Sequence, residues 1–181
     1  MMKRFFLFAM LLTASAQADE ITLRVTGLFS KEREKDLREA VEKNERLQIK
    51  KIDFETAKIT FTFERGDEPF KPDAKPETIR SAIDSRLKGA SNHTFSALIP
   101  SAIPKEKLKH IEIAVIGLDC KACSYAAYRA IFQIEGVARA TASFREGKVS
   151  ALIDPKKTDR TVLKEALKKR GVTLAQATPA P

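Results

Sequence analysis

The chain has 181 residues, of which 43% are hydrophobic and 31% charged, with 33 basic and 24 acidic side chains. This composition is that of a globular protein with one large or two small cores, and it excludes a chain that is disordered along most of its length. The basic side chains are interspersed with acidic ones and form no dense block. This pattern argues against a nucleic-acid partner and favours a solvated surface, with docking of an acidic partner or anionic lipid as the alternative.

Residues 1–18 have the pattern of a secretory signal peptide. Lys3 and Arg4 precede the apolar run 5–12, and Ala16-Gln17-Ala18 is an A-x-A cleavage site. The apolar run is too short to span a bilayer, and no later segment is apolar for long enough. We therefore expect an exported mature protein that begins near Asp19, is periplasmic or secreted, and has no integral membrane segment. Loss of Lys3 and Arg4 lowers the net charge from +9 to +7.

The mature chain contains an internal repeat. Residues 20–64 align without gaps on residues 110–154 at an offset of 90, with Gly27 and Leu28 matching Gly117 and Leu118. Further along, the offset falls to 84 because the first copy has a longer loop at 66–75, whose proline, aspartate and glycine are typical of a surface connection. The repeat predicts a first domain at 19–99, a linker at 100–109, a second domain at 110–176 and a tail at 177–181.

Each copy shows the order strand, helix, strand, strand, helix, strand, which predicts an α+β fold of two tandem ferredoxin-like (βαββαβ) domains. In the first copy, we expect strands at 21–26, 49–54, 58–64 and 94–99, and helices at 31–44 and 76–88. In the second copy, we expect strands at 110–116, 138–144, 148–153 and 172–175, and helices at 124–134 and 159–170. Asp159 or Thr158 can cap the last helix, and Gly171 can end it.

Both cysteines of the chain lie in Gly117-Leu118-Asp119-Cys120-Lys121-Ala122-Cys123, between a predicted strand and a predicted helix. The unpaired N–H groups and the positive dipole end of a helix N-terminus favour thiolate over thiol. Thiolates select Cu(I), Hg(II) or Zn(II) over Ca(II) or Mg(II), and two of them suffice for a near-linear Cu(I) or Hg(II) site. The motif therefore predicts one soft metal ion per chain, held by Cys120 and Cys123.

Two other uses of the cysteines remain open at this point. Exported proteins form disulfides, but a bridge between Cys120 and Cys123 closes so short a loop that it would stabilise the fold by only about 2 kcal/mol. A C-x-x-C at a helix start also suits thiol–disulfide exchange, although the predicted order of elements is not that of thioredoxin.

With these motifs in view, residues 110–176 resemble a heavy-metal-associated domain, the family of copper chaperones, metal-exporting ATPase modules and the periplasmic mercury carrier. The resemblance runs through Gly117-Leu118, the C-x-x-C motif, Glu135-Gly136-Val137, Asp154-Pro155 and Gly171. It implies a metal-binding protein, not an enzyme, that sequesters an ion or passes it to a transporter or another metal-binding protein. Asp-Cys-x-x-Cys is similar to the loop of zinc-, cadmium- and lead-exporting modules, whereas copper proteins carry threonine before the first cysteine.

The residues around the cysteines have secondary roles in this hypothesis. Asp119 is a candidate third ligand that would favour divalent ions, or else a solvated loop residue. Lys121 is a candidate neighbour that lowers the thiol pKa values, or else a solvated lysine. Tyr125 and Tyr128 could cover the site or pack elsewhere. His93 and His110 are predicted to be surface residues remote from the cysteines.

The first copy carries Ser30 and Arg33 where the second carries Cys120 and Cys123. A hydroxyl and a permanent cation cannot replace two thiolates, so we expect this domain to keep the fold without a metal site. It would then be a spacer, a dimerisation surface or a docking module. A chain without any chemistry, acting only as an adaptor, is the third functional hypothesis, beside metal binding and thiol–disulfide exchange.

Overall fold

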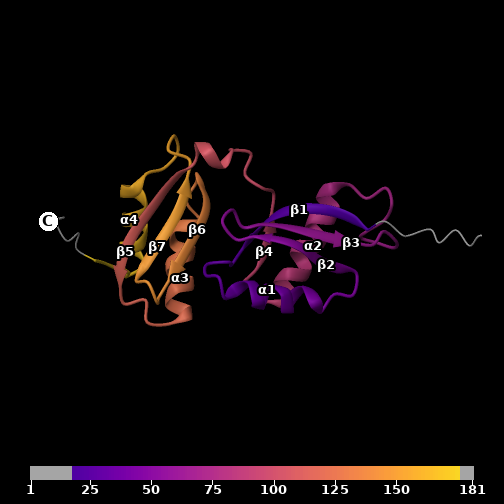
Figure 1. Ribbon diagram of the computed structural model, residues 1–181, viewed down its shortest axis with the longest axis horizontal. Helices are drawn as coiled ribbons and strands as arrows, with labels where there is room; N and C mark the ends of the chain where they lie inside the picture. The colour runs from indigo at the N-terminus through magenta and orange to yellow at the C-terminus, as the bar shows by residue number, and fades with distance from the viewer. Residues whose placement is uncertain (1–17, 176–181) are drawn as a thin grey trace, which may run out of the picture.

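The computed structural model describes residues 18–175, so the predicted signal peptide lies almost wholly outside the described residues and the predicted tail at 177–181 wholly outside them. Two four-stranded antiparallel sheets follow one another along the long axis of the molecule (Figure 1). We call residues 19–98, which contain the first sheet, the first unit, and residues 109–174, which contain the second, the second unit. No helix in the described part of the chain is long and apolar enough to cross a membrane.

The first unit has strand order β2-β3-β1-β4 and the second has order β6-β7-β5-β8. With two helices each, both units have the predicted α+β, ferredoxin-like arrangement. The elements of the first unit are β1 (Asp19–Thr26), α1 (Arg33–Glu42), β2 (Leu47–Asp53), β3 (Lys58–Phe63), α2 (Pro76–Ala90) and β4 (Ser96–Leu98). A 3-10 turn, η1 (Lys105–Lys107), leads to β5 (Lys109–Ile116), α3 (Lys121–Phe132), β6 (Val137–Ser143), β7 (Lys148–Ile153), α4 (Arg160–Lys169) and β8 (Thr173–Leu174).

The strand register reproduces the offset of 90 seen in the sequence. Ile21 pairs with Phe61 in the first sheet, and Ile111 pairs with Ala151 in the second. The turn before the third strand is also shared, because Val25 N–H donates to the Ala57 carbonyl at 2.9 Å and Val115 N–H to the Gly147 carbonyl at 2.8 Å. The internal repeat is therefore a repeat of structure.

Each unit packs its helices on one face of its sheet around its own core. Alternating strand residues meet helix residues spaced three or four apart, which is the pattern that buries one face of each element. Leu37, Ile83 and Phe61 are fully buried in the first core, and Ile131 and Leu163 in the second. The predicted caps of α4 are present, since the Asp159 side chain accepts N–H bonds from Thr161 and Val162, and Gly171 has a left-handed backbone.

Two details differ from the sequence-based expectations. Helix α3 begins at Lys121 instead of 124, because the Cys120 side chain caps it and draws both cysteines onto its first turn. The loop at 66–75 is more than a surface connection, because Phe70 is fully buried and stacks on Phe63 at 5.1 Å between ring centroids. A single aromatic side chain can anchor a loop that is otherwise polar.

The two units are joined by a contact that the sequence did not predict. The loop between β1 and α1, residues 27–32, reaches from the first unit to α3 and β6 of the second (Figure 1). Phe29 is 5% exposed and belongs to the core of the second unit. Its ring lies 5.7 Å from that of Tyr125 and 5.9 Å from that of Tyr128, and its carbonyl accepts the Ala142 N–H at 2.9 Å.

Buried polar groups complete this contact. Gly27 N–H donates to the Tyr128 hydroxyl at 2.9 Å. Arg24 donates to the Ala138 carbonyl at 2.7 Å, and Arg139, 5% exposed, donates to the carbonyls of Leu28 at 2.7 Å and Phe54 at 3.0 Å. Burial raises the pKa of Tyr128 to about 12 and lowers that of Arg139 to about 10, so the hydroxyl is neutral and the guanidinium charged at neutral pH. Because the Arg24 Nη1, the Tyr128 hydroxyl and the Arg139 guanidinium bond specific backbone groups of the other unit, the contact fixes the register of one unit on the other.

Candidate metal centre

The cysteine loop is set by the end of β5 and the start of α3. β5 ends at Ile116, and Gly117 follows with φ of 82°, a left-handed conformation that glycine adopts without strain. Cys120 has extended backbone and is the N-cap of α3, with its Sγ accepting the N–H of Cys123 at 3.2 Å. A cysteine sulfur thus takes the capping role that serine or aspartate usually has.

The two sulfurs face one another at the protein surface. They lie 2.7 Å apart, and both cysteines are free. Cys120 is exposed and Cys123 is half-buried, with its side chain against the edge of the second core. Solvent, a metal ion or another protein can therefore reach the pair without any rearrangement of the fold.

The two thiols differ in acidity. The pKa of Cys120 is lowered by the hydrogen bond from the Cys123 thiol and by the backbone N–H groups of Cys123 and Ala122. The pKa of Cys123 is raised by the same thiol contact and by desolvation, since a second negative charge beside the first is unfavourable. Cys120 is therefore the first sulfur to ionise and the better nucleophile at neutral pH.

The two flanking charged residues are exposed and lie outside the sulfur pair. Asp119 acts on Cys120 only through its charge, which opposes ionisation. Within residues 18–175, no group of three or more His, Cys, Asp or Glu side chains is placed to hold one ion, so Asp119 is not gathered with the two cysteines. Lys121 opens α3. The pKa of Glu32 in the first unit is lowered by hydrogen bonds from its backbone and Ser30, and less by the charges of Arg145 and Lys121. The groups that lower the pKa of Cys120 are the neighbouring thiol and backbone N–H groups.

The other predicted residues lie apart from the sulfurs. His93 and His110 are both exposed, as expected. Tyr128 is 2% exposed and faces the first unit, where it accepts the Gly27 N–H, and Tyr125 packs on Phe29. Of the two expectations for the tyrosines, packing away from the site is therefore the one that the structure supports.

In the corresponding loop of the first unit, the Arg33 side chain stands at the position of Cys123. The Arg33 guanidinium lies 4.6 Å from the ring centroid of Phe95 and 5.4 Å from that of Phe29, and it pairs with Asp36. Ser30 sits at the position of Cys120 and bonds Glu32. Arg33 thus has its own partners in the first unit, and the absence of a metal site from this copy stays a prediction.

Sequence reasoning missed the residues that hold the units together, chiefly Arg24, Phe29 and Arg139. The available signal was Phe29 itself, an aromatic residue in a loop whose counterpart, Asp119, is polar. A large apolar side chain in an otherwise exposed loop suggests a surface that covers it.

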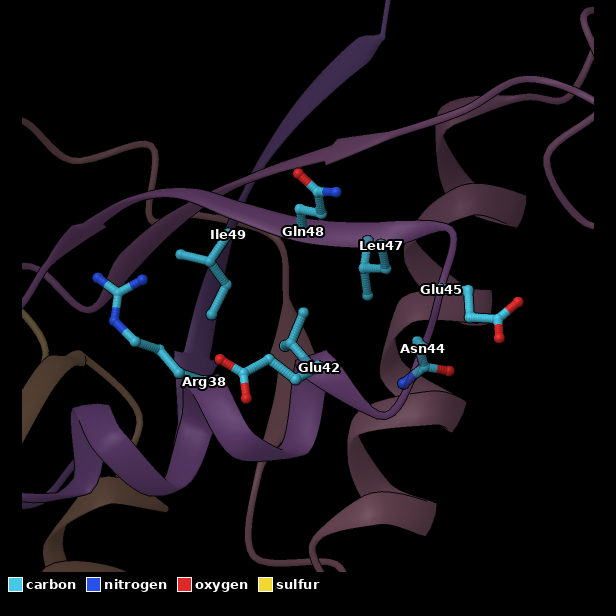
Figure 2. Close-up of a pocket in the computed structure, with 8 residues that line it drawn as sticks. Arg38, Glu42, Asn44, Glu45, Leu47, Gln48 and Ile49 are labelled. Atoms are coloured by element: carbon cyan, nitrogen blue, oxygen red, sulfur yellow. The ribbon is translucent and has the colours of Figure 1, made fainter.

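A cavity of about 400 Å³ lies in the first unit, between α1 and β2. Figure 2 shows Arg38 and Glu42 projecting from α1 and Ile49 from β2 into the space between the two elements. It holds no cysteine and is separate from the sulfur pair.

Comparison with known proteins gives similarities of structure alone. No family model matches the chain, and no curated protein matches it either. Among solved structures, the CopZ metallochaperone is 27% identical over 37% of this chain and 100% of its own, with a TM-score of 0.36. Oxidised MerP from Ralstonia metallidurans CH34 is 25% identical over 38% of this chain and 94% of its own, also at 0.36. The water-soluble region of the P-type ATPase CopA from Bacillus subtilis is 18% identical over 92% of this chain and 99% of its own, at 0.36.

Proposed function

We propose that this chain is an exported protein that binds one soft metal ion between Cys120 and Cys123, and sequesters it or passes it to a transporter or another metal-binding protein. The observation that carries the proposal is the exposed sulfur pair on the first turn of α3. Backbone N–H groups of that turn stabilise the Cys120 thiolate, and a bound cation would offset the repulsion that raises the pKa of Cys123. The CopZ structure, to which part of this chain is similar, is named as a metallochaperone.

The sulfur pair must open slightly to take an ion. Metal–sulfur bonds near 2.3 Å place two sulfurs about 4 Å apart at a tetrahedral ion and further apart at a linear one. The present separation is 2.7 Å. Because Cys120 is exposed, rotation about its side-chain bond can supply the difference, and no core residue has to move.

Native mass spectrometry tests this proposal. The reduced mature chain, prepared without oxygen, should take up one Cu(I), Hg(II) or Zn(II) ion in a competition that ranks the three. Cys120→Ser should abolish binding and Cys123→Ser should weaken it severely. His93→Ala with His110→Ala is the matched control and should bind as the wild type does. Stoichiometric binding that survives in Cys120→Ser/Cys123→Ser would end the proposal.

One observation favours thiol–disulfide exchange as a second candidate. The two sulfurs face one another at the protein surface, and Cys120 is the more acidic thiol. In this reaction, the Cys120 thiolate attacks a disulfide of a partner and releases one partner thiolate. Cys123 then displaces the second partner thiolate and forms the Cys120–Cys123 disulfide, so two electrons pass to the partner.

Catalysis of exchange separates the two candidates. A redox protein should reduce a test disulfide repeatedly when glutathione is supplied, whereas a metal carrier should react once and slowly. Turnover comparable with that of a thioredoxin, together with metal binding that glutathione outcompetes, would favour the second candidate.

A further inference from the structure

The contact between the two units uses one surface from each copy of the fold. The first unit contributes the β1–α1 loop, residues 27–32, and the second contributes the groove between α3 and β6, where Tyr128, Ala138 and Arg139 lie. Because the units share one fold, each also has the other surface. The second unit has the cysteine loop at 117–120, and the first has the groove between α1 and β2.

The unused groove is hollow. Its residues Arg38, Gln48 and Ile49 correspond to Tyr128, Ala138 and Arg139 at the offset of 90, and they line the cavity of about 400 Å³ (Figure 2). The same position in the second unit is filled by Phe29 and its neighbours. The first unit therefore presents an open version of a socket that the molecule already uses.

The unused loop matches one end of this socket in charge. Asp119 stands at the position of Phe29, which packs on Tyr125 and Tyr128. The counterparts of those two tyrosines are Lys35 and Arg38, both exposed. At this end of the groove, an aromatic contact is thus replaced by one carboxylate facing two cations, while Glu42 and Glu45 also line the groove. A swap of this kind preserves local attraction and adds selectivity.

Two further correspondences support docking of the cysteine loop in this groove. One is an apolar pair, and the other is a backbone N–H at the edge of β2. Arg139 lies on the ring of Phe54 at 4.6 Å, and the counterparts of these two residues are Ile49 and Phe144. Phe144 is 41% exposed, an uncommon state for so large an apolar side chain. The Ala142 N–H that bonds Phe29 corresponds to that of Ile52, which the shared register places on the outer edge of β2.

We propose that the cysteine loop of one copy docks in the α1–β2 groove of a second copy, so that chains associate head to tail. Asp119 would meet Lys35 and Arg38, and Phe144 would meet Ile49. Ala114 replaces Arg24, whose hydrogen bonds stabilise the contact within the chain, so the contact between chains is weaker and reversible. Ser30, the counterpart of Cys120, stays half-exposed in the observed contact, so Cys120 remains reachable in the assembly.

Such a contact joins two different surfaces and leaves one of each free, so it propagates into open chains. Sedimentation velocity of the reduced, metal-free mature chain should show a mean size that grows with protein concentration and shrinks with added salt. Because the assay contains no metal, its outcome is independent of the proposed metal site. A wild-type chain that remains monomeric up to millimolar concentration would overturn the proposal.

Paired variants test the two surfaces separately. Arg38→Glu in the groove and Phe144→Glu beside the loop should each weaken association at least about tenfold. A mixture of the two should form dimers that do not grow, because Phe144→Glu keeps an intact groove and Arg38→Glu keeps an intact loop. Val162→Glu is the matched control, since Val162 is 42% exposed on α4, and it should associate as the wild type does.

A charge exchange provides the second measurement. Asp119→Arg should disperse the chains, and Asp119→Arg with Arg38→Glu in one chain should restore association. Association that is unaffected by Arg38→Glu and Phe144→Glu would place the contact elsewhere and refute the proposal.

Discussion

At the scale of single residues, the two thiols are chemically unequal although they share one turn of helix. The pKa of Cys120 is lowered and that of Cys123 is raised, chiefly by the hydrogen bond between them. A limiting amount of iodoacetamide should therefore modify Cys120 first, and the preference should shrink as rising pH ionises Cys123 as well. Peptide mapping by mass spectrometry measures the ratio. Equal labelling, or earlier labelling of Cys123, would contradict the assigned order.

Asp119 is the residue that we expect to distinguish Zn(II) and Cd(II) from Cu(I). If its carboxylate turns toward a bound Zn(II) or Cd(II), Asp119→Ala should weaken the binding of that ion by about 1–3 kcal/mol and leave the binding of Cu(I) nearly unchanged. Competition with chelators of known affinity measures both. Asp119→Asn is the control that keeps the side-chain size, and equal losses for all ions would show that Asp119 is not a selective ligand.

At the scale of elements, the β1–α1 loop acts as an anchor between the units. Phe29 is 5% exposed, so Phe29→Ala should leave a cavity and cost about 3–5 kcal/mol of stability where the units meet. Urea denaturation followed by circular dichroism measures the loss. Phe144→Ala, which truncates an exposed phenylalanine, is the control and should change stability by less than about 1 kcal/mol.

The sequence predicted the elements well because their signals are local. The period-two run before Gly117 and the helical spacing after Cys123 both concern neighbouring residues, as does the capping of α4 by Asp159. The contact of Phe29 with Tyr125 joins residues far apart in the chain, and no local period encodes it. The same holds for Phe70, whose burial depends on Phe63 and on a loop path that composition does not specify.

The candidate site likewise combines features that local sequence signals predict with contacts between distant residues that they do not. The spacing of Cys120 and Cys123 was sufficient to place both at the N-terminus of the helix, although the helix was predicted from 124 and begins at Lys121. The electrostatic partner of Lys121 could not be predicted, because Glu32 belongs to the other unit. The tyrosines likewise face a surface that only the folded chain presents. Side chains that lie between two units have partners that sequence spacing alone does not identify.

At the scale of the whole molecule, the buried contact should make the two units unfold together. Scanning calorimetry of the mature chain should show one transition, because unfolding of one unit alone would lose the buried Phe29 contact and the bonds of Arg24, Tyr128 and Arg139 across the boundary. Phe29→Ala should split the transition into two. Two separate transitions in the wild type would show that the units are thermodynamically independent.

The docking of the first unit on β6 also bears on how the protein avoids aggregation. β6 is an edge strand of the second sheet, and an open edge beside apolar side chains readily recruits strands from other molecules. Here the Phe29 carbonyl occupies the Ala142 N–H, and the first unit covers Tyr128. The first unit, which has no thiols, thus protects the edge strand of the second unit, which carries them, from pairing with other molecules. The second unit produced alone should be less soluble than the full chain, even though it contains every proposed metal ligand.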